Sequence, residues 1–310
     1  MISVGIVYFN EFEQMKVCLR SIFSGSNPNY ISQVIVVSNT KFTDALIDVI
    51  KSYEVKFNKI NFKIVKNKNN NIGESRRLLA LNCESAFLSI TDPDCEVSPN
   101  WLKNYLEEYA KLIKVDQNIA SLCGPVKIKS NFKIYNFLQK NKIKTFSPQI
   151  DISDDPVLID HSQTSNAFYI VEKLLSVGSF SLAHKKSGED LELGLRLKAN
   201  QLNNYSIGRA SVTHDLTSTK LGFTKRFYKL GLGQLNPYLG ERKIHMIVIT
   251  TLILFVCSIL LLKAKVLAII LFIPLVLLLK ISVMNQLGAL FAFISYSVGY
   301  IESFIINELG

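Results

Sequence analysis

An apolar run of strand length ends in two carboxylates separated by a proline in residues 86–96, AFLSITDPDCE. In an extended chain residues i and i+2 point to the same side, so we expect Asp92 and Asp94 to project together. Like charges held this close are unfavourable unless a cation lies between them, and carboxylate oxygens suit a hard divalent ion such as Mg²⁺ or Mn²⁺. The competing interpretation is a turn centred on Pro93, with both aspartates facing water or capping the next helix.

The residues before this stretch alternate between strand-like and helix-like patterns. Apolar runs typical of strands lie at 2–9, 34–37, 62–65 and 86–91, and apolar residues recur at helical intervals in 10–23, 45–53 and 74–83. Asn10, with Glu13 three residues later, has the spacing of a capping box for the first helix. The alternation predicts an α/β fold with a mostly parallel sheet and helices on both faces. Ligands bind beyond the carboxyl ends of such strands, so the position of the two aspartates favours the cation site.

The pattern changes after the aspartates. Ser98 and Pro99 are typical of a helix start, and 166–171 and 205–212 of strands, whereas 130–160 shows little periodicity. A further helix opens at Gly188, and acidic residues in a first turn usually serve the helix dipole, so the ordinary explanation of Glu189 and Asp190 is that they cap this helix.

Charge and cysteine content limit the class of protein. The chain has 310 residues, 35 Lys and Arg against 25 Asp and Glu, and five cysteines without disulfide-framework spacing, which fits a reducing compartment. No basic region precedes the first strand, so we expect no signal peptide. A nicotinamide-binding fold is disfavoured because no G-x-G-x-x-G follows the first strand. We expect no nucleic-acid partner, since the basic excess concentrates beside an apolar segment.

The C-terminal third has the composition of a membrane region. Residues 218–243 form a basic amphipathic segment that includes Arg226, and such a segment suits an anionic membrane surface or a phosphate. Residues 244–310 contain two almost wholly apolar stretches and a weaker third. Spanning a core of about 30 Å takes roughly 20 apolar residues, so we expect membrane helices here without fixing their number. The basic flank predicts an inner-membrane protein whose domain 1–217 faces the cytoplasm.

The ordered motifs of this chain resemble those of the family-2 inverting glycosyltransferases, which have the GT-A fold. The resemblance covers about residues 1–235 and rests on several motifs taken together. These are Ile35 to Asn39, Asn71-Ile72-Gly73 with Arg76 and Arg77, Thr91 to Cys95 with Trp101, Thr164 to Ile170, and Gly188 to Leu193 with Arg196.

The resemblance implies a role for each matched residue. Tyr8, Phe9, Glu11, Ser38, Arg76, Arg77, Asp92 and Arg226 would bind the nucleotide-sugar donor. Asp94 and His214 would hold the divalent cation, Mg²⁺ or Mn²⁺, on the diphosphate. Asp190 would be the catalytic carboxylate beside the acceptor.

Two departures from the family pattern bear on the substrate. A UDP-sugar is the favoured donor, but Ser38 stands where the family usually has an aspartate that contacts the uracil or another base, so the choice of nucleotide stays open. The Q-x-x-R-W signature of processive members is missing, so we expect transfer of a single sugar.

The resulting hypothesis is a membrane-bound enzyme that glycosylates a hydroxyl of a cell-surface glycan or a lipid-linked glycan precursor. Two alternatives stay open. One is transfer to a polyprenyl phosphate, and the other is a non-catalytic membrane scaffold that keeps the fold.

Overall fold

The computed structural model describes residues 1–38, 43–131 and 155–217. The chain divides into two compact units, Met1–Thr217 and Ser218–Gly310. Within the described part of the chain, no helix is both long enough and apolar enough to cross a membrane. The segments 218–243 and 244–310, for which the sequence predicts a membrane region, lie outside the described residues, as does Arg226.

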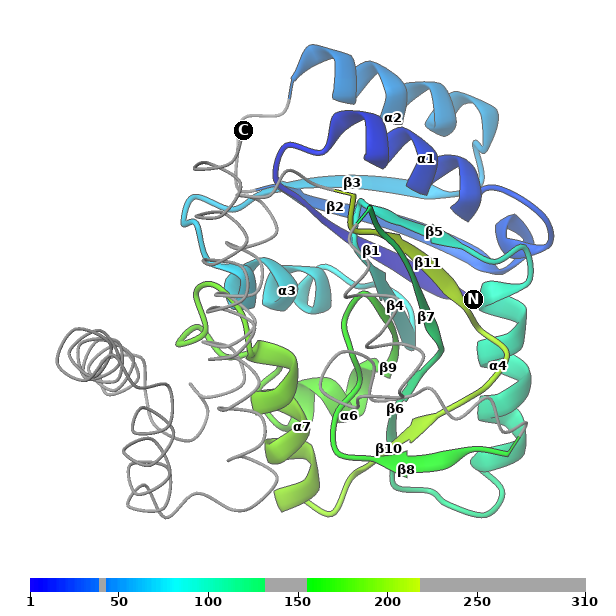
Figure 1. Ribbon diagram of the computed structural model, residues 1–310, viewed down its shortest axis with the longest axis vertical. Helices are drawn as coiled ribbons and strands as arrows, with labels where there is room; N and C mark the ends of the chain where they lie inside the picture. The colour runs from blue at the N-terminus through cyan, green and yellow to red at the C-terminus, as the bar shows by residue number, and fades with distance from the viewer. Residues whose placement is uncertain (39–42, 132–154, 218–310) are drawn as a thin grey trace, which may run out of the picture. The chain divides into compact units, whose positions relative to one another are not determined.

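The first unit consists of strands and helices in near-regular alternation up to β4 (Figure 1). In chain order the elements are β1 Ile2–Tyr8, α1 Phe12–Ile22, the 3-10 helix η1 Asn27–Tyr30, β2 Ile31–Ser38, α2 Asp44–Lys56, β3 Asn61–Lys66, α3 Ile72–Leu81, β4 Phe87–Thr91, β5 Cys95–Val97, α4 Trp101–Leu112, β6 Ile119–Cys123, β7 Val126–Lys129, β8 Val157–Ile159, β9 Asn166–Ile170, α6 Val171–Ser176, α7 Glu189–Ala199, β10 Asn203–Ser206 and β11 Val212–Asp215.

The main sheet has eight strands in the order β3-β2-β1-β4-β9-β6-β10-β8. The four strands β1 to β4 pair in parallel, as does β6 with β10. β9 runs antiparallel between β4 and β6, and β8 is antiparallel to β10. The predicted mostly parallel α/β sheet is therefore confirmed, with antiparallel members that the sequence pattern does not indicate.

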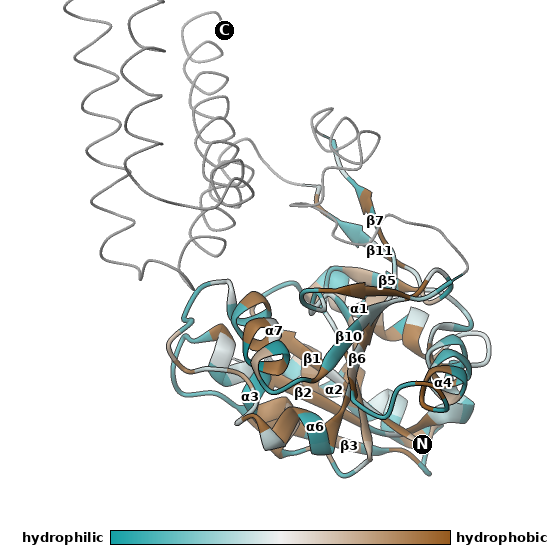
Figure 2. Ribbon diagram, turned by 90° about the horizontal axis from the view of Figure 1, so that it is seen from below, coloured by the Kyte–Doolittle hydropathy of each residue, from teal (hydrophilic) through white to brown (hydrophobic). Residues whose placement is uncertain are grey.

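Helices cover both faces of this sheet because the side chains of the central strands alternate between two hydrophobic clusters. In β1, Ile2, Val4 and Ile6 belong to the cluster that also contains buried residues of α1, α2 and α4. Val7 of the same strand belongs to the other cluster, with residues of α3, α6 and α7. The helices divide accordingly in Figure 1, and Figure 2 shows the hydrophobic colour on the central strands.

A second sheet of three strands, in the order β5-β11-β7, lies beside the carboxyl end of β4. β11 runs antiparallel to β5 and parallel to β7. The single strand predicted over 205–212 is therefore wrong, because β10 belongs to the main sheet and β11 to the second. The chain turns between them at 208–211, where Ala210 approaches so closely that a Cβ on Gly124 would overlap its carbonyl oxygen.

Two predicted helix starts also differ from the structure. The cap of α1 is Glu11 and not Asn10, and Glu13 forms an ion pair with Lys16 at 2.7 Å instead of closing a capping box. The carboxylate of Glu11 accepts hydrogen bonds from the backbone N–H groups of Phe9 and Asn10, at 3.1 and 2.9 Å, so local backbone donors hold this side chain. α4 begins after Asn100, and not after the predicted Ser98 cap.

Candidate active site

The two aspartates lie on a tight turn between β4 and β5. The N–H of Cys95 donates to the carbonyl oxygen of Asp92 at 3.1 Å, and Pro93 occupies the second position of the turn, where its fixed φ is favourable. The expectation of an extended chain here is therefore wrong, since the turn directs the two carboxylates to different partners. Both side chains are still largely shielded, with 24% of Asp92 and 15% of Asp94 exposed.

Arg76 of α3 is the partner of Asp92. Its Nη2 lies 3.3 Å from Asp92 Oδ1, and its Nη1 forms an ion pair with Glu189 at the start of α7. Only 9% of the Arg76 side chain and 2% of the Glu189 side chain are exposed. Arg76 Nε and Glu189 Oε2 have no hydrogen-bond partner among the described residues. One buried guanidinium thus connects the aspartate turn to the helix that carries Asp190.

The first turn of α3 is packed against the segment that leads into α7. Asn71 caps the helix by accepting from Glu74 N at 3.1 Å, and its amide donates to the carbonyl of Leu182 at 2.7 Å. The backbone N–H of Gly73 donates to the carbonyl of His184 at 3.1 Å. A Cβ on Gly73 would overlap a backbone carbonyl oxygen of this segment, so glycine permits the close approach. The packing fixes α3 and the start of α7 relative to each other.

Glu189 does not serve as the helix cap that its position predicts. The cap is Gly188, at φ 87°, and no side chain provides a capping hydrogen bond. Glu189 shares a helical face with Leu193 and Leu197, which are both buried. That spacing is the signal in the sequence that indicates a buried carboxylate requiring a cation.

Asp190 is half-buried beside Glu189. Its Oδ1 accepts from the N–H of Leu191 at 2.9 Å, which holds the carboxylate at the start of the helix. Burial raises the pKa of the Tyr169 hydroxyl well above its usual value, and the nearby negative charge of Asp190 raises this pKa further. Asp190 therefore lies near β9, on the side of the sheet that α3 and α7 cover.

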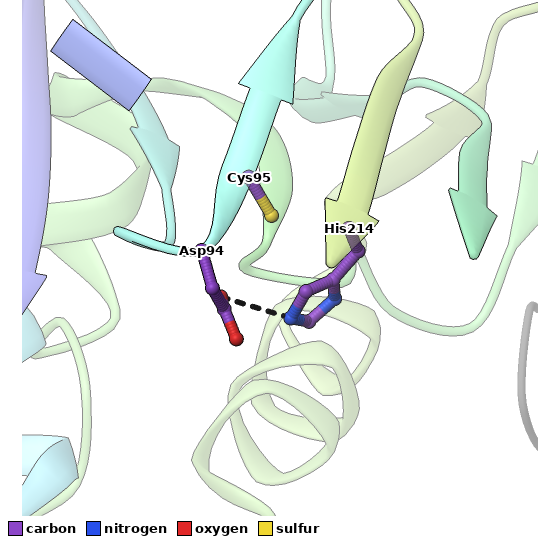
Figure 3. A group of neighbouring side chains, drawn as sticks. All are labelled: Asp94, Cys95 and His214. Atoms are coloured by element: carbon purple, nitrogen blue, oxygen red, sulfur yellow. Dashed lines mark ion pairs between the residues drawn. The ribbon is translucent and has the colours of Figure 1, made fainter. Parts of the chain in front are cut away.

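Asp94 lies next to His214 of β11. His214 Nε2 is 3.0 Å from Asp94 Oδ1 (Figure 3). The backbone N–H of Asp215 donates to the carbonyl oxygen of Asp94 at 2.8 Å. Cys95 is directly opposite His214 in the antiparallel pairing of β5 and β11. One ligand atom from each of Asp94, Cys95 and His214 lies within 4.8 Å of the others. The oxygen and nitrogen donors fit a divalent cation, and the sulfur adds a softer ligand.

The other residues predicted to bind the donor lie near the carboxyl ends of the first strands. Tyr8 ends β1 opposite Ser38, which ends β2, and Asp92 follows β4 beside them. The side chains of Tyr8 and Ser38 are buried, and that of Tyr8 packs in the hydrophobic core. Phe9 is half-buried and packs against the second cluster. These positions gather at one edge of the sheet, as expected for a ligand site in this fold.

Arg77, by contrast, does not join the buried ion pairs. It is half-buried on α3, next to Arg76 in sequence, and the structure brings only Arg76 to the aspartate turn.

Asn166 at the start of β9 connects α4 with the segments before β7 and β11, and sequence reasoning does not single it out. Its Oδ1 accepts from Trp101 Nε1 at 2.8 Å and from the hydroxyl of Tyr105 at 2.7 Å. Its amide donates to the carbonyls of Pro125 and Ala210, at 3.0 and 2.7 Å. Asn166 is fully buried, so each of these bonds satisfies a group that water does not reach.

Comparison of the sequence and of the fold with known proteins identifies a matching family and several similar proteins. The model of the family described as Glycosyl transferase family 2 matches residues 3–168. A curated relative from Methanococcus voltae, dolichyl N-acetyl-alpha-D-glucosaminyl phosphate 3-beta-D-2,3-diacetamido-2,3-dideoxy-beta-D-glucuronosyltransferase, is 28% identical over 131 residues. The match covers 42% of this chain and 40% of that relative, so the chain spans well under two thirds of its length.

Two solved structures have the same fold at low sequence identity. The mannosyltransferase PcManGT from Pyrobaculum calidifontis, in complex with GDP-Man and Mn²⁺, has a TM-score of 0.58 and 13% identity, over 96% of this chain and 86% of that one. GalNAc-T7 with UDP, GalNAc and Mn²⁺ has a TM-score of 0.55 and 12% identity, over 75% of this chain and 48% of that one. These matches confirm the expected GT-A-like α/β fold.

Proposed function

Since this chain belongs to glycosyl transferase family 2, we propose that it transfers a single sugar from a nucleotide-diphospho-sugar to an acceptor hydroxyl, with inversion at the anomeric carbon. The observation that carries the proposal is the chain of contacts from Asp92 through Arg76 to Glu189, which brings Asp190 to the side of the aspartate turn. A carboxylate for the donor and one for the acceptor thus come from two distant segments of sequence.

Asp94 and His214 are the residues that would hold a divalent cation. Their oxygen and nitrogen atoms lie 3.0 Å apart and are mostly shielded from water, a donor set that suits Mn²⁺ or Mg²⁺. When bound, such an ion stabilises the negative charge of the departing nucleoside diphosphate. Asp92 pairs with Arg76 and is still 24% exposed, and its carboxylate is proposed to orient the donor. The Mn²⁺ in the complexes of PcManGT and GalNAc-T7 supports a divalent ion.

Asp190 is the residue proposed to remove the proton from the acceptor hydroxyl. Its attachment to the N-terminus of α7 and its half-buried position hold a carboxylate in place at the edge of the site. A positioned general base is worth typically about 10²–10⁴-fold in rate. Arg76 and Glu189 do not move protons in this scheme, and they fix the helix that carries Asp190.

The proposed acceptor is a sugar hydroxyl of a lipid-linked glycan precursor. The name of the M. voltae relative describes transfer to a dolichyl-phosphate-linked sugar, which supports this acceptor class. The apolar composition of 244–310 and the basic residues of 218–243 support attachment to the cytoplasmic face of the inner membrane. The donor nucleotide is proposed to be UDP, although the complexes of the similar structures include both UDP and GDP-Man.

The test is release of nucleoside diphosphate by the full chain in detergent, supplied with a panel of nucleotide-sugars, lipid-linked acceptors and Mn²⁺. Asp94→Asn and Asp190→Asn are each expected to lower turnover by about 10²-fold or more, from loss of the ion and of the base. Asp160→Asn is the matched control, because Asp160 is exposed and pairs with Lys198 at the surface.

Two results would change the assignment. A severe effect of Asp94→Asn with a mild effect of Asp190→Asn would indicate a lipid phosphate acceptor, which needs no general base. Absence of both turnover and binding of nucleoside diphosphate with Mn²⁺ would favour a non-catalytic scaffold.

A further inference from the structure

We propose that Cys95 is a direct ligand in a mixed oxygen, sulfur and nitrogen site with Asp94 and His214, which binds Zn²⁺ and other thiophilic divalent ions in preference to Mg²⁺. The inference rests on the proposed function insofar as it concerns the same ion site. It adds a sulfur ligand and an ion preference that Asp94 and His214 alone do not specify.

Strand register brings the sulfur to the site. Cys95 and His214 are directly opposed in the antiparallel pair β5–β11, so their side chains project from the same face of the second sheet. Asp94 precedes Cys95 in the turn, and Figure 3 shows the three side chains converging. Ligands around a tetrahedral Zn²⁺, with bonds of about 2.0–2.3 Å, are separated by roughly 3.3–3.7 Å. The ligand atoms lie within 4.8 Å of one another, so binding of the ion has to draw them closer by side-chain rotation.

The environment distinguishes Cys95 from the neighbouring thiol of Cys18. Both thiols are buried, and the Sγ of Cys18 on α1 is 3.5 Å from the backbone carbonyl oxygen of Asp92. It does not belong to the cluster of ligand atoms formed with His214. Both thiols lie beside the same aspartate turn, but of the two only the sulfur of Cys95 is grouped with an imidazole nitrogen and a carboxylate oxygen. Cys18 is for this reason a matched control.

Binding converts the thiol to a metal thiolate. The S–H bond of Cys95 breaks, its proton passes to the buffer, and the sulfur donates its electron pair to the ion, with no change of oxidation state. Thiolate ligands favour Zn²⁺, Co²⁺ and Cd²⁺ over Mg²⁺, which prefers oxygen. Zn²⁺ at this site occupies Asp94 and His214, so it competes with the Mn²⁺ or Mg²⁺ of the proposed reaction.

The experiment titrates Co²⁺ into the purified full chain in detergent and records its absorption spectrum. A sulfur ligand gives a near-ultraviolet charge-transfer band, which Zn²⁺ should abolish by displacement. Cys95→Ala should lose the band and bind Zn²⁺ at least about tenfold more weakly, since even outer partners of a metal ligand are worth 10–100-fold. Its affinity for Mn²⁺ should change much less. Cys18→Ala should keep both the band and the Zn²⁺ affinity.

A Co²⁺ complex of the wild-type chain without the sulfur band would overturn the proposal, as would Cys95→Ala with unchanged Zn²⁺ affinity. Circular dichroism verifies that the variants are folded, and Cys95→Ser replaces Cys95→Ala if the smaller side chain prevents folding. The experiment tests this site separately from the proposed function. A sulfur band without nucleotide-sugar turnover in any ion would support the cysteine site and contradict the transferase activity. Turnover without the band would support the transferase activity and contradict the cysteine site.

Discussion

At the scale of single residues, the single positive charge of Arg76 is shared by two carboxylates that are distant in the sequence. Arg76 contacts Asp92 and Glu189, and neither Arg76 nor Glu189 is appreciably exposed. A buried pair of this kind contributes little net stability when it is intact, because desolvation offsets the attraction. Removing one member is costly, since it leaves a buried charge without compensation.

We therefore expect Arg76→Met to lower the free energy of unfolding by about 3–5 kcal/mol. The double variant Arg76→Met with Glu189→Leu should recover much of that loss, because it removes the unpaired carboxylate. Urea unfolding of the full chain in detergent measures both. Arg77→Met, on the neighbouring and half-buried position of the same helix, should stay within about 0.5 kcal/mol. A double variant that is less stable than the single one would show that the buried pair is not the cause.

Asp215 gives a pH dependence whose sign follows from its contacts. Burial raises the pKa of its carboxyl, but hydrogen bonds from Thr217 and Lys129 outweigh burial and hold the pKa at about 2. The unfolded value is about 3.9, so the folded state favours the charged form. Its stabilising contribution is present above about pH 4 and is lost as the pH falls towards 2.

The difference in unfolding free energy between wild type and Asp215→Asn should accordingly shrink as the pH is lowered from about 6 to about 3. Thr217→Val removes one hydrogen bond to the carboxylate, so the free energy of unfolding of this variant should depend less on pH than that of wild type. Urea titrations at several pH values measure the free energy of unfolding of each protein. A difference that stays constant over this range would contradict the assigned pKa.

At this scale the sequence predicts the types of site residue better than their contacts. It offers a turn at Pro93 and a cation site as alternatives, and the structure shows the turn, in which Asp92 pairs with Arg76 and Asp94 with His214. The position of Glu189 predicts a cap, because acidic residues in a first turn usually are caps, whereas its cation comes from a helix far earlier in the chain. Local spacing indicates that Glu189 is buried and needs a cation, but it does not indicate which residue supplies that cation.

At the scale of elements, α3 is held by the segment before α7. The first turn of α3 approaches that segment so closely that Gly73 has no room for a side chain. Gly73→Ala should lower the free energy of unfolding by about 1–3 kcal/mol, through overpacking, and should also reduce turnover by displacing Arg76. Thermal unfolding and the transferase assay measure the two effects.

Leu81→Ala is the control for this prediction. Leu81 ends the same helix and is 57% exposed, so little packing is lost. Equal effects of Gly73→Ala and Leu81→Ala would mean that the close approach of Gly73 to the backbone carbonyl oxygen of Ser181 does not constrain the helix.

Element prediction succeeds where a segment buries one continuous face. The elements β1 to β4 and the helices between them have strong local patterns, and their bounds agree with the predicted ranges within a few residues. The short strands of the second sheet are not visible in the sequence pattern. β5 has three residues and β7 four, and strands of that length are defined by pairing with β11, which lies far along the chain. The separation of the predicted strand 205–212 into β10 and β11 has the same cause, because each of these short strands is defined by its pairing partners.

At the scale of the whole molecule, both hydrophobic clusters and both sheets of the described residues lie within Met1–Thr217. A fragment of residues 1–217 is therefore expected to fold with one cooperative transition and to bind nucleoside diphosphate with Mn²⁺. Calorimetry measures both. A fragment that aggregates or shows no transition would mean that the later residues are needed to complete the fold.

Fragments that end at different points of the C-terminal region test the proposed membrane attachment. A fragment of residues 1–243 adds six Lys and Arg between 220 and 243. Near an anionic surface each basic residue contributes about 1 kcal/mol, so this fragment should bind vesicles containing phosphatidylserine and be released by high salt. The fragment 1–217 should not bind, and the full chain should stay with membranes at alkaline pH because of the apolar segments. Salt-resistant binding of 1–243, or alkaline release of the full chain, would contradict this arrangement. Sedimentation of the three proteins with vesicles separates electrostatic docking by 218–243 from insertion by 244–310.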